Sequence, residues 1–168
     1  MALTRKYEMI LDKLPSWSRA RELCNIYLSF RTWEYGVISY EQLTDHLLPT
    51  FYPQSSAIRN DVDHPPSTVM IHQLGLLLAV LTLGAFLDVS LPLAPDNEEG
   101  KRYLRLLHAT VDLAPILDNA PSLETLQLLA LMSACNVMGS GSLDPLGSKW
   151  RYIGLAHRLA QSVSYHSI

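Results

Sequence analysis

The most informative part of the chain for its architecture is the uncharged run Val69-Met-Ile-His-Gln-Leu-Gly-Leu-Leu-Leu-Ala-Val-Leu-Thr-Leu-Gly-Ala-Phe-Leu87. Its length is close to the roughly 20 residues that cross a bilayer as a helix. However, His72 and Gln73 interrupt the run near one end. Asp63 and Asp88 bracket it, in place of the Lys and Arg bias that orients a membrane span. A helix buried on all sides of an α-helical domain has the same composition, so we predict a central core helix and no membrane partner.

Helix boundaries are frequent on both sides of this run, and strand patterns are scarce. Capping patterns occur at Ser39–Gln42 and at Asp96–Glu99, where side chains can accept from N–H groups that the first turn of a helix leaves unpaired. Prolines and a Gly-Ser-Gly stretch separate the segments. The fold class is all-α, an irregular bundle of about five to six helices after a lead-in over residues 1–14. The predicted helices cover about 17–34, 39–49, 67–86, 96–115, 123–138 and 148–163, with a loop over 51–66.

Two of these helices, 67–86 and 123–138, are apolar on nearly every face, so each must be covered on all sides. A small domain buries only about two-thirds of its surface, and we expect this chain to enclose one such helix fully. A contiguous exposed apolar patch, large enough to drive self-association or to take up a partner, is therefore expected. The helix over 148–163 is amphipathic, with Leu155, Ala156 and Leu159 on its apolar side and His157 and Arg158 on its polar side.

The composition of the chain limits the classes of function that it can have. The 168 residues are consistent with one domain. Thirteen Lys and Arg against 16 Asp and Glu give a net charge of −3, and the basic residues form only loose clusters, which argues against direct binding of nucleic acid. Cys24 and Cys135 lie far apart, which excludes a disulfide framework and a zinc site built from cysteines. Both thiols are expected to be small buried hydrophobes in a reducing compartment.

No motif predicts a catalytic site. The glycine-rich stretch Gly139–Ser142 lacks the preceding strand and the following Gly-Lys of a phosphate-binding loop. Asp61, Asp63 and His64 are metal-competent, but they lie in a proline-rich loop, where such side chains are ordinarily solvated. His72 is expected to be a hydrogen-bonded core residue. We therefore predict no enzyme activity, no cofactor, and no catalytic, cofactor-binding, metal-binding or DNA-binding residue.

The C-terminal third carries the most specific pattern of the chain. It begins with Pro121-Ser-Leu-Glu-Thr-Leu-Gln-Leu-Leu-Ala-Leu-Met132 and passes through Gly139-Ser-Gly141. It ends with Trp150-Arg-Tyr-Ile-Gly-Leu-Ala-His-Arg-Leu-Ala-Gln-Ser-Val-Ser-Tyr-His166. This pattern resembles the regulatory, or middle homology, domain of fungal transcription factors with a binuclear zinc cluster, also called the xylanolytic transcriptional activator regulatory domain. That family shows a Ser-x-Glu-x-Leu-Gln helix, then Trp, Gly, Ala, Arg and Ala at this spacing, then Gln-Ser and a closing Leu-His.

An earlier part of the chain is similar to the opening of the same domain. Leu23–Tyr27 and His46–Phe51 match an aromatic-ended helix followed by a Pro-Thr-Phe turn. The resemblance thus covers residues 15–168, strongly over 121–166. Within the pattern we expect Gly154 and Ala156 to allow close helix approach.

The resemblance implies a regulatory and interaction domain of a nuclear transcription factor that acts in DNA-templated transcription regulation. In that family a separate N-terminal cluster of six cysteines binds two zinc ions and reads DNA. These 168 residues contain no such cluster, so no zinc-binding or DNA-binding residue carries over. Protein partners are implied, with a homodimer and a small-molecule effector as further candidates. Because the family continues for several more helices, the domain is expected to be incomplete at its C-terminus.

A second hypothesis from a different class stays open. The chain could be a free-standing helical protein that holds an apolar ligand or a partner helix between its Leu-rich helices. A basic six-cysteine segment encoded upstream of Met1 would distinguish the two hypotheses.

Overall fold

The structure, a computed structural model, describes residues 2–30, 36–53, 65–116, 121–139, 154–159 and 161. In this part of the chain there are helices and no strands, which confirms the predicted all-α bundle. The elements are α1 (Ala2–Leu11), α2 (Trp17–Ser29), the π-helix η1 (Gln42–Leu47), α3 (Leu48–Phe51), α4 (Thr68–Leu87), α5 (Glu98–Leu113) and α6 (Leu123–Gly139).

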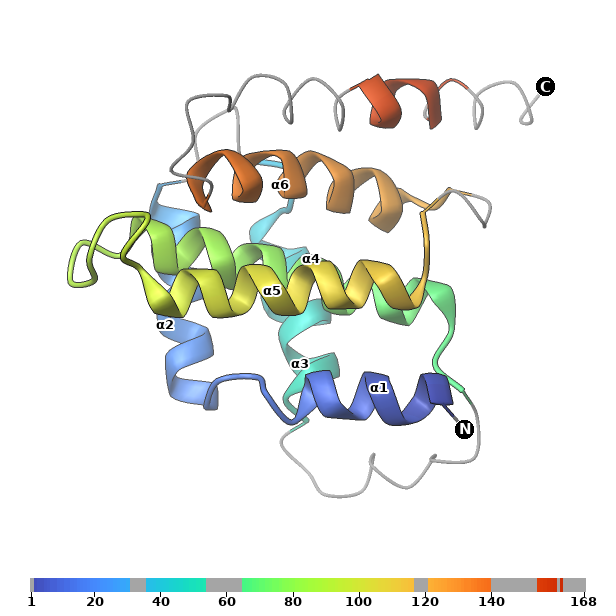
Figure 1. The fold of residues 1–168 in the computed structure, drawn as a ribbon, viewed down its shortest axis with the longest axis horizontal. Coiled ribbons are helices and arrows are strands. Elements are labelled where there is room, and N and C mark those ends of the chain that lie inside the picture. The colour runs from blue at the N-terminus through green and yellow to red at the C-terminus, as the bar shows by residue number, and fades with distance from the viewer. Residues whose placement is uncertain are drawn as a thin grey trace.

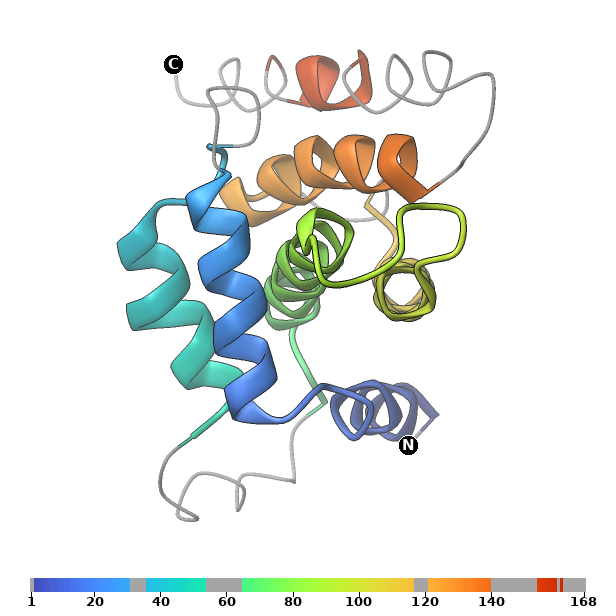
Figure 2. The same ribbon diagram turned by 90° about the vertical axis from the view of Figure 1, so that its left-hand side faces the viewer.

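Helix α4 occupies the centre of the bundle, as predicted. In Figure 2, α2, α5 and α6 surround it on three sides. Every residue from Leu74 to Phe86 is buried. Among the described helices it is the one that is long and apolar enough to cross a membrane, and 83% of its most apolar window is buried inside the protein. Its apolar composition is therefore accounted for by its place in the core.

The close crossing of α2 and α4 depends on Gly84. A Cβ atom at this position would lie 2.4 Å from the backbone oxygen of Leu23. No side chain can be accommodated there unless the two backbones move apart, because the contacting atom belongs to the α2 backbone rather than to a flexible side chain.

Helix α6 is also largely covered, although we expected the chain to enclose only one of its two apolar helices. Of its residues only Leu123 is exposed, and Leu128, Leu131 and Cys135 are buried in the core. Figures 1 and 2 show α6 lying across α4 and α5, with the helical residues 154–159 on its other side. Both apolar helices are therefore largely covered in the described part of the chain, and the self-association expected of an exposed apolar patch stays a prediction.

The N-terminal residues form a helix where we expected only a lead-in. Helix α1 runs antiparallel beside α5 (Figure 1) and buries Tyr7 and Ile10, which lie three residues apart on one face. Two apolar anchors in a short helix give a weak sequence pattern, and it is the packing against α5 that holds the helix.

Several predicted boundaries agree with the structure. The side chain of Ser67 accepts from the N–H of Met70 at the start of α4, and that of Asn97 accepts from the N–H of Gly100 at the start of α5. Helix α2 ends at Ser29, earlier than predicted, and the hydroxyl of Ser29 donates to the carbonyl of Asn25. Such a bond competes with the helical ladder and weakens the last turn.

The prediction that a helix ends at Pro49 was wrong. The helical backbone continues through Pro49 to Phe51, so Pro49-Thr50-Phe51 is a helical turn rather than a break. The preceding turn is the π-helix η1, in which the N–H of Leu48 bonds to the carbonyl of Leu43. Pro49 therefore stands in the first turn of a new α-helical segment, where a missing N–H costs no helical hydrogen bond.

The last described residues confirm one expectation and correct another. In the stretch 154–159 Leu155, Ala156 and Leu159 are half-buried while His157 and Arg158 are exposed, as the amphipathic pattern predicted. Gly154, in contrast, is exposed, and a Cβ atom there would meet nothing within 4 Å, so it permits no close helix approach. Trp150, and Ser162 of the Gln-Ser pair, lie outside the described residues.

Candidate functional site

The residues singled out for metal chemistry are not placed by the structure. Asp61, Asp63 and His64 lie outside the described residues, as do residues 140–142 of the glycine-rich stretch. Within the described ranges no group of three His, Cys, Asp or Glu side chains converges as a metal site would require. The candidate sites therefore come from side chains that tertiary packing brings together.

His72 is one such group, and it is a structural one. Its Nε2 lies 3.1 Å from the carbonyl oxygen of Ala114, and its Nδ1 lies 3.0 Å from the hydroxyl of Thr125. A carbonyl can only accept, so Nε2 carries the proton and Nδ1 accepts from Thr125. With both nitrogens bonded and the side chain buried, His72 joins α4 to α6 and to the end of α5, as expected for a core histidine.

The cysteines also follow the expectation. Cys24 and Cys135 are unpaired and buried. Burial raises the pKa of the Cys24 thiol to about 12 and also raises that of Cys135. Neither thiol therefore provides the thiolate that nucleophilic chemistry needs.

A pair of glutamine side chains links η1 to α6. The Nε2 of Gln42 donates to the Oε1 of Gln127 at 2.8 Å, and the Nε2 of Gln127 donates back to the Oε1 of Gln42 at 2.9 Å and to the carbonyl of Val37. At the start of α6, the Oγ1 of Thr125 accepts from the N–H of Ser122. The polar residues of this part of α6 thus hold helices together rather than facing a ligand.

The densest polar cluster is centred on Arg19 of α2. Its guanidinium donates to both carboxylate oxygens of Glu99, at 3.1 and 2.7 Å. It also donates to Asp88 at 2.9 Å and to Glu22 at 2.7 Å. One cation therefore connects α2 to the end of α4 and to the first turn of α5, and the bidentate pair with Glu99 fixes its orientation.

These contacts shift the ionisation of the cluster. The Arg19 guanidinium holds the pKa of Glu99 below its ordinary value, with a further hydrogen bond from the hydroxyl of Tyr103. Hydrogen bonds from Ser90, followed by Arg19, lower the pKa of Asp88. Burial, with the bond to Glu99, raises the pKa of Tyr103 to about 12. The lowered pKa values of Glu99 and Asp88 mean that both carboxylates are charged at neutral pH, and Arg19 hydrogen-bonds to both of them.

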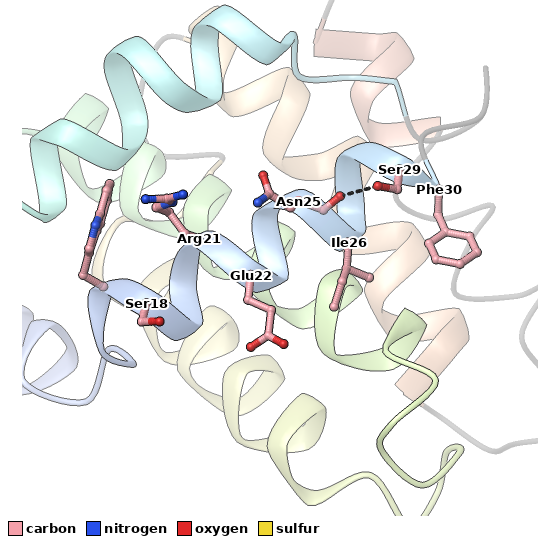
Figure 3. Close-up of a pocket in the computed structure, with 8 residues that line it drawn as sticks. Ser18, Arg21, Glu22, Asn25, Ile26, Ser29 and Phe30 are labelled. Atoms are coloured by element: carbon pink, nitrogen blue, oxygen red, sulfur yellow. Dashed lines mark hydrogen bonds between the residues drawn. The ribbon is translucent and has the colours of Figure 1, made fainter.

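Two hollows open on the surface next to this cluster. The first, about 560 Å³, follows the outer face of α2 (Figure 3). Its ends are aromatic, with Trp17 at one end and Phe30 at the other, and Arg21 and Glu22 lie between them. The guanidinium of Arg21 lies 6.0 Å from the centre of the Trp17 ring, which itself packs against Tyr52.

The second hollow, about 480 Å³, is polar and lies between the α1–α2 connection and the start of α5. We call it the charged pocket; its lining residues are Asp12, Lys13, Leu14, Pro15, Ser16, Arg19, Glu99, Arg102 and Tyr103. Five of the nine carry charge, so the pocket is suited to an ionic ligand rather than an apolar one.

The sequence analysis did not find this pocket. Arg19, Glu99 and Asp88 are separated by up to 80 positions in the chain, and no local spacing connects them. The only local indication was the capping pattern at Asp96–Glu99, which the sequence analysis interpreted as the start of a helix.

The chain was compared with protein families, with curated proteins and with solved structures, and no match was found in any of the three comparisons.

Proposed function

We propose that this chain is a regulatory and interaction domain of a fungal transcription factor, acting in DNA-templated transcription regulation in the nucleus. The observation that carries the proposal is the residue pattern over 121–166, which begins in α6 with Ser122, Glu124, Leu126 and Gln127. In this proposal the domain has no enzyme activity and holds no cofactor.

The positions of these residues support a scaffold role for the pattern. Ser122 caps the start of α6 together with Thr125, and Gln127 bridges α6 to η1 and to the carbonyl of Val37. A pattern made of interior hydrogen bonds and core side chains maintains a fold. The functional contacts of such a domain are then made by its surface with protein partners.

The net charge of the chain is consistent with a domain that contacts protein partners and leaves DNA binding to another part of the regulator. A net charge of −3 provides few phosphate contacts, and sequence-specific binding to DNA depends on many of them. In this proposal DNA is read by a separate zinc cluster of the complete regulator, and this domain sets the regulator's activity.

A tethering experiment tests the proposal. The chain is fused to a heterologous DNA-binding domain, and a reporter is measured in a fungal nucleus against the DNA-binding domain alone. We expect the fusion to raise or lower reporter output. The variant Gly84→Ala, which cannot keep the α2–α4 crossing, should lose the effect, and Gly154→Ala should retain it. Unchanged output from a folded fusion that is present in the nucleus contradicts the proposal.

A second candidate function is a free-standing helical protein that binds an apolar ligand or a partner helix. The observation that favours it is the open hollow along α2, whose ends are formed by the exposed side chains of Trp17 and Phe30. An upstream reading frame that encodes six cysteines in a basic segment supports the first function, and its absence together with a silent reporter supports the second.

A further inference from the structure

The connection between α4 and α5 carries the most exposed large apolar side chains of the described residues. Val89 is 93% exposed and Leu93 is 81% exposed, whereas the other exposed side chains of this kind range from 37% to 65%. Pro92 and Pro95 are exposed as well, and residues 89–95 contain no charged side chain. In Figure 1 this connection projects beyond the end of the bundle. It is therefore an exposed apolar segment rather than one scattered apolar side chain.

The fold fixes this connection at both ends. At its start the carboxylate of Asp88 accepts from the N–H and the hydroxyl of Ser90, at 2.9 and 2.6 Å, and from Arg19 at 2.9 Å. At its end the Nδ2 of Asn97 donates to a carbonyl in the last turn of α4. Between the two ends Leu91 packs against the core. A partner that covers the exposed side chains does not have to order the connection first, which favours binding.

The charge around the connection indicates what kind of partner can cover it. Residues 88–102 carry four carboxylates and two cations, so this stretch is net negative. Arg19 and Glu22, which pair beside it, add one charge of each sign. Asp96, directly after the apolar residues, is exposed and forms no ion pair with the described residues. A complementary surface combines an apolar pocket with lysine or arginine at its edge, whereas an anionic lipid surface would be repelled.

We propose that the connection between α4 and α5 is a docking surface for a protein partner, with Val89 and Leu93 entering an apolar pocket surrounded by basic side chains. Transfer of these side chains from water into such a pocket stabilises the complex. The inference rests on the proposed function, because it names the surface through which the domain contacts its partner.

The reporter fusion that tests the proposed function also tests this surface. The double variant Val89→Ser with Leu93→Ser should abolish the change in output that the unaltered fusion causes, and each single substitution should weaken it. Asp96→Lys should reduce the change, because it places a cation against the basic edge of the pocket. The matched controls are Tyr40→Ser, at a side chain that is 60% exposed elsewhere, and Asp112→Lys, near the other end of α5. Both should leave the output unchanged.

Fusion levels in the nucleus, and urea midpoints of the purified variants, should match those of the unaltered chain, which separates a loss of docking from a loss of fold. A double variant that retains the full effect overturns the inference and leaves the proposed function standing. An unaltered fusion without effect contradicts the proposed function and the inference with it.

Two measurements on the purified chain distinguish a protein partner from other occupants of this surface. The chain is mixed with vesicles of phosphatidylcholine, with and without phosphatidylserine, and it is sedimented alone over a range of concentrations. We expect neither vesicle binding nor self-association through this surface. Vesicle binding or self-association that the double variant abolishes overturns the proposal, because it assigns the surface to a membrane or to a second copy of the chain.

Discussion

Helix α4 and the first turns of α5 lie side by side, but they are built from opposite residues. Between Leu74 and Phe86 every residue of α4 is buried, and Thr82 is the one polar side chain among them; its hydroxyl donates to the carbonyl of Leu78. The start of α5 carries Glu98, Glu99, Lys101 and Arg102 in one and a half turns. The core around α4 is therefore stabilised by close packing of apolar side chains. The start of α5 is stabilised by ion pairs and hydrogen bonds, so the two regions should respond to different substitutions.

The largest loss of stability is expected when a side chain is added at Gly84, where α4 crosses α2. Gly84→Ala places a Cβ atom against the backbone oxygen of Leu23 at 2.4 Å. We expect a loss of about 3 kcal/mol in the free energy of unfolding, at the upper end for overpacking because backbone must move. Urea denaturation measures it. The control Gly154→Ala, where the new methyl meets nothing within 4 Å, should change stability by less than about 0.5 kcal/mol. Equal effects would show that α2 and α4 do not cross as described.

The ion-pair cluster at the start of α5 should be destabilised by removing its cation, Arg19. Arg19→Met leaves Asp88 and Glu99 without their ion pair, at side chains that are only 6% and 22% exposed. We expect a loss of about 2 kcal/mol at neutral pH, below the value for a fully buried pair because solvent screens the exposed part. Thermal or urea unfolding measures the loss.

The same cluster predicts a pH dependence. The pKa values of Glu99 and Asp88 are lowered in the folded protein, from ordinary values of 4.5 and 3.8. Groups of this kind contribute stability that is complete above the unfolded pKa and is lost as pH falls through the folded pKa. Stability should therefore fall as the pH drops from about 5 toward 3, and the fall should be shallower in Arg19→Met. A slope unaffected by the substitution would contradict the assignment.

A smaller loss of stability is expected when the buried polar side chain of His72 is replaced. His72→Leu removes the bonds to Ala114 and Thr125 and leaves a buried carbonyl without a donor. The expected cost is about 1–2 kcal/mol. His108→Leu is the matched control, because His108 is exposed and hydrogen-bonds to Asn136 at the surface; it should be nearly neutral in the same denaturation experiment.

The smallest effect is expected for apolar side chains outside the centre. Val89 and Leu93, in the connection between α4 and α5, are 93% and 81% exposed. Val89→Ser and Leu93→Ser should each change the free energy of unfolding by less than about 0.5 kcal/mol, since these side chains bury little apolar surface. A larger loss in either variant would show that the connection is covered in solution.

Much of the fold was predictable because its cues are local. The apolar run of α4 and the capping pattern at Asp96–Glu99 depend on residues within one or two turns. The structure places the run in the central helix, which starts after Ser67 as predicted, and the cap at Asn97 within the predicted pattern. Helix α1, with two buried anchors, and the π-helical turn that carries Pro49 into α3 were missed. Their stability comes from neighbours distant in sequence, and periodicity within the segment carries little trace of it.

Local sequence was sufficient to predict that this protein is helical, that α4 is its centre, and that Cys24, Cys135 and His72 belong to the core, because burial follows from the apolar residues around each of them. Only tertiary packing could show that α6 is largely covered, that Gly84 allows the close crossing of α2 and α4, and that Arg19 reaches Asp88 and Glu99. Charge pairing depends on distances in space, and side chains from α2, α4 and α5 come within hydrogen-bonding distance only after the helices have packed.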